Sequence, residues 1–293
     1  MKDFPSCFGE NAVQVSDFSS SSSNKSAHNL VTSVYQCRFG RRSCLITVGW
    51  SKNLMGQGFS VGIDDNRDQC LCKIDVKPWL FSKRKGLKTV EAYSSKIDIY
   101  WDLSSAKFGS GPEPYEDFFV AIVSNQKMIL LLGDMPKEAY KKTVATHSSS
   151  SSAHLFSKRE HIYGKKIFNT KVRFLNNGQL HDLVVECDTV GVDEPCLVIR
   201  VDNKNVMQVK RLQWKFRGNH TILVDGIAVE VFWDVHNWLF SSSHGNAVFM
   251  FKSNLMSDQD SPSLSWSWSS QRALDTRTQN HGLSLVLYAW KSE

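Results

Sequence analysis

The chain of 293 residues is long enough for one large β domain or for two ordinary domains, each with its own core. Its 41% hydrophobic and 22% charged residues exclude wholesale disorder, and no apolar run approaches the roughly 20 residues of a membrane-spanning helix. The net charge of +6 favours a polyanionic partner until the excess charge is located in the chain.

The start of the chain and the cysteines bear on the cellular compartment. Residues 1–7 lack the apolar segment of a signal peptide. The seven cysteines are odd in number and lie mostly inside strand-like runs, which is typical of reduced, buried thiols rather than a disulfide or metal framework. We therefore expect an intracellular protein, in the cytoplasm or alternatively the nucleus, without a metal or other cofactor.

Residues 1–29 form a tail that ends in a serine run and has too little apolar surface to fold alone. From residue 30 to residue 134, apolar residues alternate with polar ones, and turn residues interrupt the runs. The turns that we predict here include residues 83–86 and 124–127. This stretch is the first of two β repeats.

The same order of strand-like runs recurs over residues 171–293, which we predict to be a second copy. Three markers keep nearly the same offset between the copies: 135 positions for Trp79 and Trp214, 132 for Trp101 and Trp233, and 132 for Phe108 and Phe240. Residues 217–219 form the turn that matches residues 83–86. The main difference is a Trp- and Ser-rich loop over residues 253–282 in the second copy. We interpret the pattern as an internal duplication.

Helical signal is scarce. Residues 136–143 are one candidate, and a single turn after each Trp-Asp pair is another, with Asp102 or Asp234 as cap and Phe108 or Phe240 packing toward the core. The predicted fold class is all-β, with duplicated antiparallel β-sandwich or barrel halves and little helix. Two separate sandwiches and one large closed sheet both remain open.

Residues 135–170 are predicted to be a basic, Ser-rich connector. Between positions 135 and 171, eight lysines and arginines are opposed by two glutamates, so this stretch carries the entire excess of +6. That placement weakens the case for a basic groove on the β body. It favours either a flexible basic arm or a solvated linker.

The sequence lacks recognisable catalytic motifs. It contains no Gly-x-Ser-x-Gly elbow, no phosphate-binding Gly-rich loop and no His-Glu-x-x-His, and the paired carboxylates are spaced too far apart on a strand to share a proton. Trp101 and Trp233 are interpreted as core anchors. The candidate binding surface consists of residues expected in loops or in the connector: Trp238, Trp266, Trp268, Lys141, Lys142, Lys165 and Lys166.

Four segments carry a resemblance to a known family: Met1–Glu10, Asp102–Pro114, Val209–Asn219 and Leu287–Glu293. They resemble the plant family called domain of unknown function 868. The resemblance spans nearly the whole chain and implies a plant intracellular protein. It brings no established activity and no site residues.

Three functions are consistent with these observations. The first is a non-enzymatic β-rich binding or scaffold module with a protein partner. The second is a β-barrel that binds a small lipid or sugar, or an enzyme with a site between the repeats. The third is contact with nucleic acid or an anionic membrane surface through the basic connector. We favour the first, because the sequence lacks recognisable catalytic motifs.

Overall fold

The computed structural model describes residues 29–291, apart from positions 41, 66–69, 77–83, 93–94, 146–152, 176–177, 189–193, 242–244 and 254–281. Strands form nearly all of the regular structure, as the period-two pattern predicts. The first half of the chain supplies β1 (Asn29–Phe39), β2 (Arg42–Asn53), β3 (Gly56–Asp65), β4 (Cys70–Val76), β5 (Lys85–Ala92), β6 (Ser95–Asp102), β7 (Lys107–Phe108), β8 (Pro114–Glu116), β9 (Phe119–Ser124), β10 (Lys127–Gly133) and α1 (Pro136–Thr143). The second half supplies β11 (His154–Tyr163), β12 (Ile167–Val172), β13 (His181–Asp188), β14 (Cys196–Val201), β15 (Lys204–Val209), β16 (Arg217–Val224), β17 (Ile227–Asp234), α2 (His236–Phe240), β18 (Asn246–Ser253) and β19 (Ser284–Trp290).

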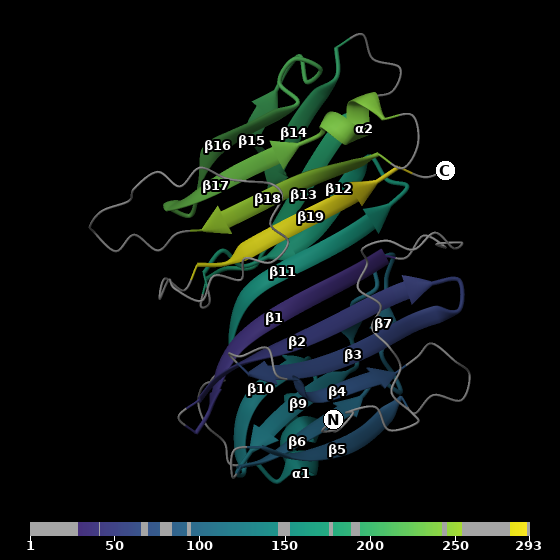
Figure 1. Cartoon of the computed structure of the whole chain (residues 1–293), viewed down its shortest axis with the longest axis vertical. Coiled ribbons are helices and arrows are strands. Elements are labelled where there is room, and N and C mark those ends of the chain that lie inside the picture. Colours follow the sequence, from purple (N-terminus) through teal and green to yellow (C-terminus); the bar gives the residue numbers. More distant parts are fainter. Residues whose placement is uncertain are drawn as a thin grey trace, which may run out of the picture.

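One large sheet runs through both halves of the molecule (Figure 1). Its nine strands lie in the order β16-β17-β18-β19-β11-β1-β2-β3-β4. Neighbouring strands are antiparallel except β11 and β19, which are parallel. The order begins and ends on different strands, so this sheet is open. The all-β class is confirmed, and the structure answers the question of closure: two sandwiches share one continuous sheet.

Two four-stranded sheets complete the sandwiches. The first, β10-β9-β6-β5, packs on β1 to β4, and the second, β12-β13-β14-β15, packs on β16 to β19 and β11. Val31 of the first core lies opposite Glu160 in the β1–β11 register, and Glu160 lies opposite Leu287 of the second core. Since these three residues share a side of the large sheet, both small sheets cover the same face of it.

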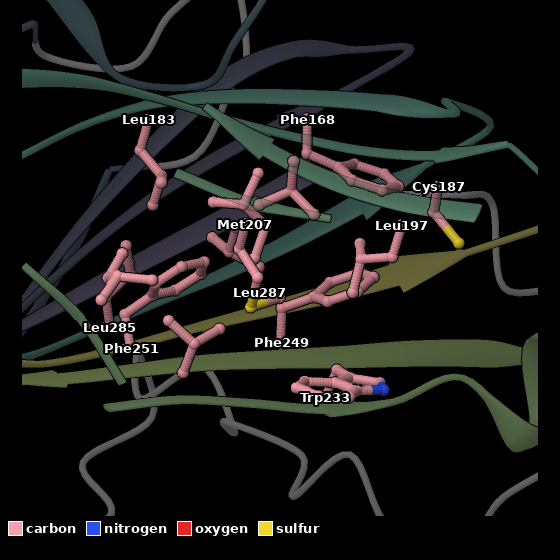
Figure 2. Close-up of a cluster of buried hydrophobic side chains, with 14 of the residues drawn as sticks. Phe168, Leu183, Cys187, Leu197, Met207, Trp233, Phe249, Phe251, Leu285 and Leu287 are labelled. Carbon is pink, nitrogen blue, oxygen red and sulfur yellow. The ribbon is translucent and has the colours of Figure 1, made fainter. Parts of the chain in front are cut away.

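The core of the second sandwich forms because alternate residues of each strand point inward. Figure 2 shows large side chains of the small sheet meeting those of the large sheet. All of them are at most 7% exposed. The small sheet contributes Phe168, Leu183, Cys187, Leu197 and Met207, and the large sheet contributes Trp233, Phe249, Phe251, Leu285 and Leu287.

The stretch predicted to be a connector contains regular structure. Its helix has the predicted bounds, Pro136–Thr143. Beyond it, β11 lies at the centre of the large sheet and pairs with a strand on each side. The described residues of this stretch are therefore not a flexible arm. The strand was missed because two of its inward-facing positions hold Lys158 and Glu160, which interrupt the apolar alternation.

Two predicted turns are wrong. β5 begins at Lys85 and β16 begins at Arg217, so Gly86 and Gly218 are strand residues. Each glycine lies directly opposite a tryptophan, Gly86 opposite Trp101 and Gly218 opposite Trp233. Glycine in a strand often marks the close approach of a neighbouring group, and here that group is the indole ring.

The predicted burial of aromatic markers is confirmed for two tryptophans and wrong for Phe240. Trp101 and Trp233 are buried, as expected of core anchors. Trp214 is 78% exposed, and Phe240 is 56% exposed and packs on Phe216 and His236 rather than in the core. Trp79 lies outside the described residues.

The predicted caps behave differently in the two halves. An Asp234 carboxylate oxygen accepts a hydrogen bond from the His236 N–H at 3.0 Å, and α2 follows, with Val235 rather than Asp234 as its N-cap residue. Asp102 accepts the corresponding bond from the Ser104 N–H at 3.2 Å, but bends and the short strand β7 follow it rather than a helix.

The two Gly–Trp contacts make a matched prediction. A Cβ atom at Gly86 would lie 2.5 Å from Cζ2 of Trp101, and one at Gly218 would lie 2.3 Å from Cζ2 of Trp233. Both indoles are buried, so neither ring can move away freely. We expect Gly86→Ala and Gly218→Ala each to lower the free energy of unfolding by about 1–3 kcal/mol, measured by urea denaturation. Gly111→Ala, where a Cβ meets nothing within 4 Å, is the control. Equal stability of all three variants would contradict the packing described here.

Candidate functional site

Of the predicted binding residues that the structure describes, one is buried and the others lie on two separate elements. Trp238 is buried in the second core, where its ring meets Phe168 edge to face at 6.4 Å. Its assignment to a binding surface is therefore wrong, because the short helix α2 turns this side chain inward. Trp266 and Trp268 lie outside the described residues.

The four predicted lysines lie on two separate elements. Lys141 and Lys142 are on α1, and Lys165 and Lys166 follow the end of β11; all four are exposed. Lys142 pairs with Asp102 and lies 5.3 Å from the centre of the Phe119 ring. Desolvation raises the pKa of Asp102, but the hydrogen bonds from Lys142 and Ser104 outweigh it and leave the pKa below its ordinary value. At least one connector charge is therefore neutralised by the first sandwich.

A buried charged cluster occupies the junction between the sandwiches. Lys158 Nζ lies 2.9 Å from a carboxylate oxygen of Glu113 and 2.9 Å from one of Glu160. The side chains of Lys158 and Glu160 are 11% and 7% exposed, and that of Glu113 is 37% exposed. The Thr170 hydroxyl donates a hydrogen bond to Glu160. We call Lys158, Glu160, Glu113, Thr170 and the neighbouring Tyr35 the junction cluster.

The junction cluster joins elements of both halves. Tyr35 comes from β1 and Glu113 from the segment between β7 and β8, whereas Thr170 comes from β12. Desolvation lowers the pKa of Lys158, but Glu160 and Glu113 outweigh it and raise this pKa above the ordinary lysine value. Burial and the Glu113 charge raise the pKa of Tyr35 to about 12. At neutral pH the cluster therefore holds a charged lysine and a neutral phenol, which suits an ionic clamp better than proton transfer.

Two facing cysteines are chemically quiet. Cys37 and Cys44 lie opposite each other on β1 and β2, and the Cys37 thiol donates a hydrogen bond to the Cys44 carbonyl oxygen at 3.6 Å. Burial raises the pKa of Cys37 to about 12. The thiolate needed for nucleophilic or redox chemistry is therefore not formed near neutral pH. Cys70, by contrast, is exposed.

The face of the large sheet opposite the small sheets carries a row of stacked rings. His161 and Tyr163 of β11 lie beside Tyr288 and Trp290 of β19, because these strands pair in parallel register. Ring centres are 4.6 Å apart for His161 and Tyr288 and 5.8 Å apart for Tyr163 and Trp290, with planes within 13° of parallel. We call these four residues the aromatic row.

The aromatic row is half-buried and uncharged. All four rings have intermediate exposure, and none belongs to the three buried core clusters. Burial, with a smaller effect of Arg159, lowers the pKa of His161, so its imidazole is neutral at physiological pH. The Trp290 indole N–H is buried and has no hydrogen-bond acceptor among the described residues. Unsatisfied buried donors are rare in proteins, so this one points to an acceptor outside the described residues.

The aromatic row could have been found in the sequence. Tyr288 and Trp290 alternate with buried Leu287 and Ala289, and His161 and Tyr163 alternate with Glu160 and Ile162. Polar-edged aromatics at alternate positions are typical of a half-exposed sheet face. The signal was hidden because His161 and Tyr163 fell in the predicted connector.

Residues 26–291 match the family model described as "Plant protein of unknown function (DUF868)". The chain belongs to this family. No curated protein and no solved structure matches it. For this DUF868 member, the described residues include no helix long and apolar enough to cross a membrane. They also include no group of three or more His, Cys, Asp or Glu side chains placed to hold a metal ion.

The junction cluster predicts a large loss of stability when its cation is removed. Lys158→Met leaves Glu160 buried and without its partner, so we expect the free energy of unfolding to fall by about 3–5 kcal/mol. Lys171→Met removes an exposed lysine 3.9 Å from Asp182 and should change it by less than about 1 kcal/mol. The double variant Lys158→Met/Glu160→Met should lose less than Lys158→Met alone. If Lys158→Met cost no more than Lys171→Met in urea denaturation, the clamp would be refuted.

The same lysine predicts a dependence on alkaline pH. Its folded-state pKa is raised above the unfolded value of about 10.4, so its contribution is complete below that pH and is lost as pH rises through the folded-state pKa. We expect the stability difference between the wild type and Lys158→Met to be constant between about pH 7 and pH 9 and to narrow above about pH 10.4. Urea denaturation at each pH measures it. If this stability difference instead narrowed on acidification, at pH values still well above the pKa range of carboxylates, the assignment of the effect to Lys158 would be contradicted.

Proposed function

We propose that this protein is a non-enzymatic intracellular binding or scaffold module, and that a protein partner docks on the aromatic row. The observation that carries the proposal is the row itself: four stacked rings on one continuous sheet, one of them with a buried indole N–H that lacks an acceptor among the described residues. Tyr and Trp are enriched in protein interfaces because they combine a large apolar area with a polar tip. A partner's carbonyl oxygen is a suitable acceptor for the indole.

The continuity of the large sheet supports a scaffold role. The large sheet is continuous across both sandwiches, and the junction cluster ties them through ion pairs rather than through a linker. A surface at the centre of such a sheet is held in one geometry before binding. Preorganisation of this kind lowers the entropic cost of association.

Two other functions receive less support. One is a small-ligand or enzyme site between the repeats, but the described part of that junction is occupied by the ion-paired Lys158, Glu160 and Glu113. The other is contact of the basic connector with nucleic acid or an anionic membrane. Lys142 and Lys158 of that stretch already pair with carboxylates, so the charge left for a partner is reduced.

We also propose that the two sandwiches descend from a duplicated unit. Supporting this, Trp101 and Gly86 form the same cross-strand pair as Trp233 and Gly218, 132 positions later. The N–H of Leu103 donates to the Arg84 carbonyl oxygen, and that of Val235 donates to the Phe216 carbonyl oxygen at the same offset. The halves differ in placement, because β5 and β6 belong to a small sheet and β16 and β17 belong to the large one.

The docking proposal predicts loss of partners without loss of stability. A Tyr288→Ser/Trp290→Ser variant should recover the wild type's specific partner proteins from plant extract at a yield at least about tenfold lower, since each interface aromatic of this kind contributes about 2 kcal/mol or more. The control, Thr47→Ala/Thr221→Ala, alters two polar strand residues away from the aromatic row. Quantitative mass spectrometry after affinity capture measures recovery, and thermal unfolding verifies that both variants are folded.

Two outcomes would reject the docking proposal. In one, the folded double variant retains the same partners at the wild-type yield. In the other, a protein-free metabolite fraction raises the melting temperature of the wild type but not of the variant. The second outcome would assign the aromatic row to a small ligand.

A further inference from the structure

The connection between β15 and β16 is a fixed loop at one end of the second sandwich. Leu212 is fully buried, and its N–H donates to the Pro195 carbonyl oxygen at 2.9 Å. Arg211 adopts a left-handed conformation with φ of 56°, and its carbonyl oxygen accepts hydrogen bonds from Trp214 at 2.9 Å and Lys215 at 3.2 Å. The Lys215 carbonyl oxygen accepts a bond from the buried Trp233 indole at 2.9 Å. The loop is therefore anchored at several points.

This anchored loop exposes a large aromatic side chain. Trp214 is 78% exposed although Leu212, two residues earlier, is in the core. Phe240 of α2 is 56% exposed at the same end, where it contacts Phe216 at 5.9 Å between ring centres. A folded loop that holds an indole in solvent has an apolar surface available for a partner.

Three basic residues lie in the same loop as the exposed indole. Lys210, Arg211 and Lys215 flank Trp214, and all three are exposed. Lys210 and Lys215 have no ion-pair partner among the described residues, and Arg211 reaches Glu194 at 3.8 Å, with both side chains more than 60% exposed. Arg217 is already paired with Asp234 at 2.8 Å. The end therefore keeps a positive charge next to its aromatic surface.

We propose that this basic–aromatic end, formed by Lys210, Arg211, Trp214, Lys215 and Phe240, docks on an anionic phospholipid surface. Trp prefers the interface between water and hydrocarbon, where its amphipathic ring sits at headgroup level. Each Lys or Arg near an anionic bilayer contributes about 1 kcal/mol. An indole inserted between lysines that contact headgroup phosphates uses both interactions at once and needs no membrane-spanning segment.

The arrangement fits a lipid surface better than a nucleic acid. Strands of nucleic acid follow a basic groove with several stacking platforms along it. Here the basic side chains gather on one loop, and the neighbouring strand β17 presents Glu230. This acidic group would repel a phosphate backbone that followed the strand, whereas a bilayer meets the end of the molecule alone.

The test uses the full chain and vesicles of phosphatidylcholine with and without phosphatidylserine. We expect co-sedimentation with the anionic vesicles, weakened by added salt, and little with the neutral ones. Trp214→Ser and Lys210→Gln/Lys215→Gln should each lower the partition coefficient about tenfold or more. These side chains are exposed, so unfolding temperatures should stay at the wild-type value.

Matched controls lie in the first sandwich. Leu54→Ser removes an apolar side chain that is 95% exposed, and Lys127→Gln removes an exposed lysine; both should bind vesicles like the wild type. Equal partitioning of Trp214→Ser and Leu54→Ser would overturn the proposal. So would retention of a single-stranded oligonucleotide that depends on Trp214 when the wild type binds no vesicles, and this result would assign the end to nucleic acid.

The outcome is independent of the proposed protein-binding function. Tyr288→Ser/Trp290→Ser should partition onto anionic vesicles like the wild type, and Trp214→Ser should recover the same proteins as the wild type. A negative result in one experiment therefore does not contradict the proposal for the other site.

Discussion

The pairing of β11 with β1 on one side and β19 on the other is the constraint on which the structure depends. Without this strand the two sandwiches would share no sheet, because β1 and β19 meet only through it. Its inward face must serve two cores at once. Val31 and Leu287 lie opposite the same residue, Glu160, from the two sides. An ion-paired glutamate and lysine, rather than apolar side chains, occupy this part of the inward face. Burying them is favourable only while every charge has its partner.

The same strand determines what the opposite face presents. Because side chains alternate along a strand, placing Glu160 and Ile162 inward forces His161 and Tyr163 outward. The parallel register with β19 then sets them beside Tyr288 and Trp290, strand against strand. In a parallel pair the register does not alternate between wide and narrow pairs, so both ring pairs meet in similar geometry. The junction cluster on the inner face and the aromatic row on the outer face therefore both follow from the register of β11 in the large sheet.

Much of the architecture could be predicted from the sequence because most strands bury one face and alternate clearly. Ile97, Ile99 and Trp101 mark β6, and the two-residue turn at Asn125 and Gln126, both with positive φ, marks the β9–β10 hairpin. β11 was not predicted because its inward-facing lysine and glutamate are charged, as residues of a linker commonly are. Their burial depends on partners that are distant in sequence. The position of Trp238 was predicted wrongly for a related reason. Neighbouring residues do not reveal which way an irregular loop or a one-turn helix points a side chain, and hydrogen bonds to distant groups decide it.

The distribution of net charge along the sequence was a poor guide to where unpaired positive charge lies in the structure. The sequence places the whole excess of +6 between positions 135 and 171, yet Lys142 and Lys158 of that stretch are bound to carboxylates of the first sandwich. Conversely, the rest of the chain has equal numbers of acidic and basic residues, but the two kinds are distributed differently over the structure. Around Trp214 the basic residues gather on a loop that contains no acid of its own, and Asp234 is engaged by Arg217. A partner that senses charge responds to the local field within about 10 Å, not to the sum over the chain. The anchored loop at Trp214 therefore offers an anion a local positive charge beside an exposed apolar ring.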